Sequence, residues 1–94
     1  MEFTKKATEL DDLINRKTTR IRMLIEDKNF FDAGYEYYVL ARIQDKIHNS
    51  YNDMQIKKWE KYYLLDCLTI EMVIIINLVE EKYNETISKC KSNL

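Results

Sequence analysis

Apolar residues recur near the start of the chain at alternating spacings of four and three. The positions that follow this spacing are Phe3, Ala7, Leu10, Ile14, Lys17, Ile21 and Leu24, and Lys17 is the one polar member. The spacing places all of them on one stripe of a helix, as in the seam of a left-handed coiled coil. Thr4 is placed to cap the start of such a helix. The pattern predicts a helix over about residues 4–26.

A second helix is predicted over about residues 30–48. Asp27, Lys28 and Asn29 form a polar turn, and the Asn29 side chain can cap a helix that opens at Phe30. The apolar stripe that follows comprises Phe31, Ala33, Tyr37, Leu40, Ile43, Gln44, Ile47 and Tyr51. The short turn predicts an antiparallel hairpin of the two helices. Gly34 would let another helix approach closely, although it weakens its own helix by about 1 kcal/mol relative to alanine.

A third and longer helix is predicted from about residue 54 to residue 89. The break before it covers residues 49–53, where Ser50 and Asp53 form a loose capping box. This break contains neither glycine nor proline, so a continuous helix through it is also open. The main apolar seam of the third helix comprises Leu65, Leu68, Met72, Ile75, Val79 and Tyr83. A second apolar face comprises Ile56, Trp59, Tyr63, Cys67, Ile70 and Ile74.

Residues 62–79 are apolar around most of the helix circumference, with acids only at Asp66 and Glu71. Two shorter helices cannot cover such a helix, and bare apolar surface is costly in water. We therefore expect an all-α protein in which a helical hairpin packs on a long C-terminal helix and the leftover surface forms a symmetric dimer or meets another protein. The candidate interface residues are Trp59, Tyr63, Cys67, Ile70, Ile74, Tyr35 and Tyr38.

Length and composition agree with this architecture. The 94 residues are enough for a single domain, 1–94, and a chain that is 46% hydrophobic is too apolar to be disordered. Having no proline and one glycine disfavours a sheet-rich fold. The longest uncharged run, residues 72–79, is far shorter than the roughly 20 residues of a membrane span, and the N-terminus does not resemble a signal peptide. We expect a cytoplasmic protein with no membrane partner.

Two charged residues lie at predicted core positions. The carboxylate of Glu71 lies among aliphatic residues, where it is costly unless it is paired or protonated. Lys17 interrupts the seam of the first helix in the same way. One interpretation is that both side chains reach the solvent at the edge of the bundle. The other is a buried pair between Lys17 and Glu71 that specifies the helix register or the oligomeric state.

Residues suited to catalysis or metal binding are few. His48 is the only histidine, which excludes a zinc site with several histidines in one chain. Asp45 and His48 form half of a di-iron motif, so a second copy would have to supply the rest. We expect Cys67 to be a buried reduced thiol, and Cys90 lies too far along the helix to pair with it. The sequence predicts no cofactor, no catalytic residue and no enzyme.

A basic and aromatic segment favours an alternative, nucleic-acid binding. Lys57, Lys58 and Lys61 are interleaved with aromatic residues, although a solvated helix face has the same pattern. Arg42 and His48 loosely match the Arg-x(4–6)-His motif of HEPN-type ribonucleases, which this chain resembles in being small and helical. The polar residue that follows the arginine in that motif is replaced by Ile43. The resemblance implies RNA processing at Arg42 and His48.

Three functions remain open, in order of preference. The first is a non-enzymatic interaction protein, such as a small regulator or inhibitor that binds a host protein. The abundance of Ile, Lys, Asn and Tyr is typical of AT-rich genomes and points to a phage or mobile element. The second is a nucleic-acid-binding or RNA-processing protein. The third is an enzyme whose site is assembled across a dimer, including a metal at Asp45 and His48.

Overall fold

Three α-helices make up the fold in the computed structural model, which describes the backbone of residues 2–92 and the side chains of residues 2–88. They are α1 (Lys5–Glu26), α2 (Phe30–Ser50) and α3 (Lys58–Ser92), and the described residues include no strand. All three pairs of helices are in contact. The all-α three-helix architecture predicted from the hydrophobic pattern is confirmed.

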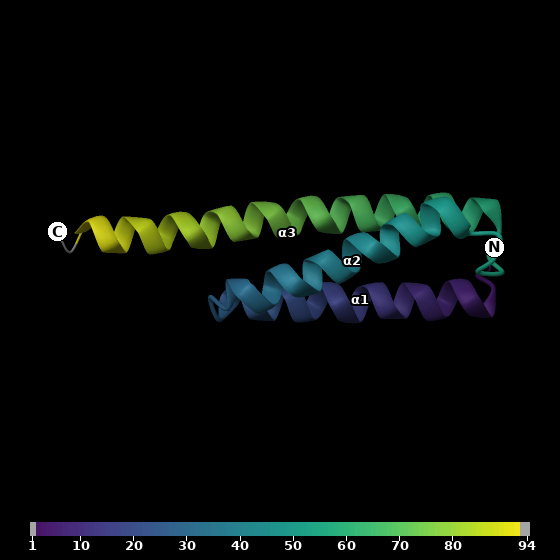
Figure 1. The fold of residues 1–94 in the computed structure, drawn as a ribbon, viewed down its shortest axis with the longest axis horizontal. Helices are drawn as coiled ribbons and strands as arrows, with labels where there is room; N and C mark the ends of the chain where they lie inside the picture. Colours follow the sequence, from purple (N-terminus) through teal and green to yellow (C-terminus); the bar gives the residue numbers. More distant parts are fainter. Residues whose placement is uncertain (1, 93–94) are drawn as a thin grey trace.

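Helices α1 and α3 run in the same direction, and α2 runs in the opposite direction and crosses from α1 to α3 (Figure 1). Polar contacts join α1 and α3 near both ends of α1. Thr4 meets Glu60 at one end, and the ammonium of Lys82 lies 3.2 Å from the carboxylate of Glu26 at the other. The C-terminal part of α3 projects beyond the turn between α1 and α2 (Figure 1). Its 35 residues outreach the 22 of α1 and the 21 of α2.

The core lies along the line where the three helices meet. Its buried apolar residues are Ala7, Ile14, Ile21 and Ile25 from α1, Ala33, Leu40 and Ile47 from α2, Ile56 from the loop, and Leu64, Leu68 and Ile75 from α3. Most follow one another at intervals of seven, which is two helical turns and keeps them on one side of each helix. The predicted seam of α1 is confirmed at Ala7, Ile14 and Ile21.

The prediction that Phe31 belongs to the apolar stripe of α2 is wrong. Phe31 is 88% exposed, whereas its neighbour Phe30 packs against the core. The reason is the helical phase: Phe31 precedes the buried Leu40 by nine residues, or two and a half turns, and so faces the opposite side. Phe30 precedes the buried Ala33 by three residues and stays on the same side.

The start of α3 also differs from the prediction. Residues 51–57 form a loop in which Gln55 has a left-handed backbone (φ of 60°), so α2 and α3 are separate helices. Ser50 and Asp53 therefore do not cap α3. Leu64, which was not assigned to the main seam, is fully buried, whereas Tyr83 is 56% exposed. Tyr83 follows Lys82, which pairs with Glu26, the last residue of α1.

Glu60 is the one fully buried carboxylate among the described residues, and it links two helix starts. Its oxygens accept hydrogen bonds from the backbone N–H groups of Lys57 and Thr4, both at 2.7 Å, and from the Thr4 hydroxyl at 3.2 Å. Thr4 in turn caps α1, because its hydroxyl oxygen accepts from the N–H of Ala7 at 3.2 Å. Burial alone would raise the pKa of Glu60, but the hydrogen bonds outweigh it and hold the pKa below its usual value.

Aromatic rings pack near the same end of the bundle. The ring of Phe3 stacks on Trp59 with a centroid distance of 5.6 Å and meets the edge of Tyr63 at 5.2 Å. Phe3 lies next to Thr4, and Trp59 lies next to Glu60, so the rings lie beside the buried hydrogen bonds. Aromatic pairs of this kind add about 0.5 to 1.5 kcal/mol beyond their area burial.

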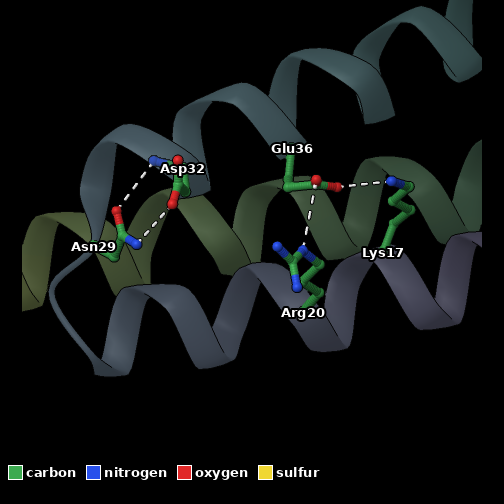
Figure 2. A network of polar contacts seen from close by, with 5 residues as sticks. All are labelled: Lys17, Arg20, Asn29, Asp32 and Glu36. Carbon is green, nitrogen blue, oxygen red and sulfur yellow. Dashed lines mark hydrogen bonds and ion pairs between the residues drawn. The ribbon is translucent and has the colours of Figure 1, made fainter.

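Lys17 and Glu71 take different partners within the chain, in place of the mutual pair that the sequence suggested. Lys17 lies 2.8 Å from Glu36 of α2, which Arg20 also approaches at 3.6 Å (Figure 2). The hydrogen bond from Lys17 is the main reason that the pKa of Glu36 lies below its usual value. Glu71 pairs instead with Arg22. Lys17 points towards α2 and Glu71 towards α1, so the helical phase separates them.

We predict that Glu60→Gln lowers the free energy of unfolding by about 2 kcal/mol, because an amide cannot accept from every donor that the carboxylate satisfies. Its pKa is lower in the folded state, so the contribution is complete above the unfolded value of about 4.3 and is lost as the pH falls through the folded value. Urea unfolding of both proteins should show their difference shrinking below about pH 4. Exposed Glu9→Gln is the control, and an equal loss in both variants would contradict the role of Glu60.

We predict that Gly34→Ala raises the free energy of unfolding by about 0.5 to 1 kcal/mol. Gly34 lies within α2, and a methyl group added there would meet nothing within 4 Å, so the variant gains helix propensity without a clash. Urea denaturation measures the change. The reverse substitution at Ala41 in the same helix, Ala41→Gly, should lower stability by a similar amount. A loss of stability in Gly34→Ala would show that the space is occupied.

Candidate functional site

The α3 outer face is the side of α3 that carries Tyr63, Cys67, Ile70, Val73 and Ile74. The exposed fractions are 60% for Ile70, 51% for Val73, 44% for Ile74 and 49% for Tyr63, and Cys67 is half-buried. These side chains are exposed because α1 and α2 both pack against the side of α3 that carries Leu64, Leu68 and Ile75. The structure thus brings four of the predicted interface residues together on one face.

Two residues of this region differ from the sequence analysis. Trp59, a predicted interface residue, is half-buried in the first turn of α3, where it stacks on Phe3. Val73 was not among the candidates, although it stands in the longest uncharged run of the chain. It lies one residue before Ile74. The other positions were identified by spacings of four and three residues, and Val73 does not follow that spacing.

Few charges interrupt the α3 outer face. Between Tyr63 and Ile74 the sequence contains two acids: Asp66, which is exposed, and Glu71, which Arg22 neutralises at the boundary with α1. Cys67 is a free cysteine, half-buried rather than buried as expected, and its proximity is the main reason that the pKa of the Tyr63 hydroxyl is raised. The side chain of Cys90 lies outside the described residues.

By length and composition alone, Lys58–Ser88 could cross a membrane. Its most apolar stretch has a mean hydropathy of 1.8, and 17% of that stretch is buried in the bundle. No span was predicted from the sequence because the longest uncharged run, residues 72–79, is short, whereas this stretch includes up to two charges. The apolar helix of a bundle satisfies the same criterion, and here α3 packs against α1 and α2 along one side.

A second exposed surface lies on α2. We define the α2 outer stripe as Phe31, Tyr35, Tyr38 and Arg42, whose spacings of four, three and four place them on one side of the helix. The three rings are 88%, 63% and 55% exposed. The Arg42 guanidinium donates a hydrogen bond of 3.1 Å to the Tyr38 hydroxyl and lies 5.9 Å from the centre of that ring. Tyr35 and Tyr38, both predicted interface residues, are therefore on a different surface from the α3 outer face.

The residues of the nucleic-acid alternative do not form one cluster with shared contacts. The ammonium of Lys61 lies 4.5 Å from the ring centre of Tyr51 and 5.4 Å from that of Tyr62, so it makes cation–π contacts within the chain. Lys57 and Lys58 are exposed at the start of α3. Arg42 contacts Tyr38, whereas His48 contacts Asn49 at 3.3 Å. Arg42 and His48 are six residues apart on α2, so their side chains point about 120° apart around the helix axis.

Among the described residues, few polar side chains are grouped in a way that suits metal binding or catalysis. No group of three or more His, Cys, Asp or Glu residues is close enough to hold a metal ion among the described residues. An apolar groove of about 240 Å³ lies between the first turns of α2 and the middle of α3, where Phe30, Tyr37, Ile76 and Val79 contribute to its lining. Glu80 at its rim is the one charged residue of that lining. The groove offers apolar contact and little else.

The chain matches no protein-family model, no curated protein and no solved structure. The two exposed apolar surfaces of the described residues are therefore the features from which we infer a function.

We predict that truncating either of two adjacent phenylalanines in the first turn of α2 has very different effects on the free energy of unfolding. Phe30→Ala should lower the free energy of unfolding by about 2 kcal/mol, because the ring packs against the core. Phe31→Ala should change it by less than about 0.5 kcal/mol, because the ring is 88% exposed. Thermal and urea unfolding give both values. Equal losses in the two variants would mean that Phe31 is covered in solution.

Proposed function

We propose that the protein is a non-enzymatic helical interaction module, which binds another protein chain through the α3 outer face. A small regulator or inhibitor that acts by binding needs packed helices that hold an exposed apolar surface in place. The α1–α2 hairpin then serves to hold α3 in place and to present its outer side.

A single observation carries this proposal. In the most apolar stretch of α3, 17% of the residues are buried, so the helix is far more apolar than its place in the bundle requires. Each Å² of apolar surface left in water forgoes about 25 cal/mol of stabilisation, and contiguous exposed patches on small proteins commonly mark interaction sites. Aliphatic and aromatic side chains with few charges are the composition of an interface core.

The basic residues support the nucleic-acid alternative less well. Lys61 and Arg42 already contact aromatic rings of their own chain, which leaves Lys57 and Lys58 as the exposed cations of the predicted set without such a contact. Nucleic-acid affinity depends on how many phosphates a protein neutralises. Two lysines beside a large apolar face favour protein binding over phosphate binding.

We predict that a photoreactive benzophenone amino acid at position 70 forms adducts of discrete protein mass in cells that contain the chain. Ile70 is 60% exposed on the α3 outer face, so the substitution should not disturb the fold. Illumination followed by denaturing electrophoresis and mass spectrometry detects the adducts. The substitution Ile74→Lys on the same face should reduce their yield at least tenfold.

Met23 provides the matched control position, since it is 64% exposed on α1 and belongs to neither exposed surface defined above. The same photoreactive residue at position 23 should produce no discrete adduct. The proposal fails if position 70 produces no adduct, if it captures lipid alone, or if positions 23 and 70 produce the same products.

A further inference from the structure

We infer that the apolar groove between the first turns of α2 and the middle of α3 binds a small apolar amine. The carbon body of the ligand lies in the groove, and its ammonium pairs with the carboxylate of Glu80 at the rim. The groove lies between α2 and α3 and does not include the residues of the α3 outer face, so this ligand site is independent of the proposed function.

The path of α2 creates the groove. Helix α2 crosses from α1 towards α3, so its first turns lie farther from α3 than its later turns do (Figure 1). In the later turns, the side-chain amide of Gln44 donates a hydrogen bond of 3.5 Å to the hydroxyl of Thr69 on α3. In the first turns, a groove of about 240 Å³ separates α2 from residues 75–80 of α3.

The groove reaches down to the core. Its floor residues come from all three helices and are each at most 3% exposed; they are Ile21, Ile25, Ala33 and Ile75. Its walls are apolar side chains that keep contact with solvent, and they include Phe30, Tyr37, Ile76 and Val79. An apolar ligand in the groove removes this wall surface from water, which is the main favourable contribution to such binding.

Gly34 keeps one side of the groove open. It is the only glycine of the chain and lies inside α2, where glycine weakens a helix. A Cβ atom added at this position would meet nothing within 4 Å, so no close contact within the described chain requires a glycine. Gly34 is part of the groove lining, and a larger residue there narrows the space that a ligand can occupy.

The volume of the groove sets the size of the ligand. Apolar cavities of about 150 Å³ bind benzene, and drug-sized ligands occupy pockets of about 300 to 1,000 Å³. The groove, at about 240 Å³, lies between these sizes. A phenyl ring with a short alkyl chain is a body of this size.

Glu80 determines the charge of the ligand. Its carboxylate is exposed and is the one charged group of the groove lining. Among the described residues, no hydrogen bond or ion pair involves Glu80. An ammonium beside it gains an attractive charge pair, whereas a carboxylate ligand meets repulsion. The next acid, Glu81, lies about 100° further around α3 and is not part of the lining.

Three probes that share a phenyl ring and a four-carbon chain test the charge preference. They are 4-phenylbutylamine, 4-phenylbutan-1-ol and 4-phenylbutyrate, which are cationic, neutral and anionic at neutral pH. Calorimetric titration should give the amine a dissociation constant of about 1 mM or lower. The alcohol should bind about threefold more weakly than the amine, and the carboxylate at least about tenfold more weakly.

Methyl NMR of isoleucine-labelled protein locates the site without any substitution. The resonances of Ile21, Ile25, Ile75 and Ile76 should shift during titration with 4-phenylbutylamine, because these side chains line the groove. The resonances of Ile14 and Ile47 should not shift. These two isoleucines are as buried as the groove floor but lie outside the groove, so they are the matched control.

Two pairs of variants separate the contributions of space and charge. Gly34→Leu adds a side chain at the groove and should weaken amine binding at least about tenfold, whereas Tyr35→Leu, outside the lining, should not. Glu80→Gln should abolish the preference for the amine over the alcohol. Glu81→Gln makes the same change of charge outside the lining and should keep that preference. Circular dichroism checks that each variant is as helical as the unaltered protein.

Four results would overturn this assignment. They are groove methyl resonances that do not respond to millimolar amine, a carboxylate probe that binds as tightly as the amine, a folded Gly34→Leu variant that binds as the unaltered protein does, and equal effects of Glu80→Gln and Glu81→Gln. None of them bears on the proposed function, because the photoreactive residue at position 70 tests a different face of α3.

Discussion

Two helices can contact one side of a third helix, and this constraint governs the molecule. The apolar surface of α3 extends well around its circumference, but α1 and α2 both pack on the side that carries Leu64, Leu68 and Ile75. The opposite side keeps Ile70, Val73 and Ile74 in contact with solvent. The exposed surface is therefore a direct consequence of folding a short chain around a long apolar helix, and the interaction we propose follows from it.

Polar contacts keep that surface in one orientation. Glu60 binds the backbone of Thr4 at the start of the bundle, Arg22 pairs with Glu71 in the middle, and Glu26 pairs with Lys82 at the far end. These contacts align α3 with α1 along the whole length of α1. Helix α3 therefore cannot rotate its outer face towards the core without breaking them. The buried Glu60 contributes most per group, because each of its donors would otherwise lie unsatisfied.

The two exposed surfaces suit different roles. The α3 outer face is aliphatic at its centre and has few charges, a composition that suits the core of an interface with another protein chain. The α2 outer stripe is aromatic, and Arg42 already stacks on Tyr38, a combination common at the centre of protein interfaces. A partner bound to the α3 outer face would leave the α2 outer stripe exposed, so a further protein could bind there without competing.

The sequence by itself determined the all-α class, the order of the helices, the seam of α1 and the caps at Thr4 and Asn29, because helical periodicity and capping are local properties. It left open whether the second and third helices are continuous, and the structure separates them at residues 51–57. It also identified the surplus face of α3, since that surplus is visible in the composition of residues 62–79. Tertiary structure decided which phenylalanine of α2 enters the core and which partners Lys17 and Glu71 take. It also decided that Glu60 joins two helix starts 56 residues apart in the chain. These outcomes depend on the relative phase of packed helices, which no local pattern encodes.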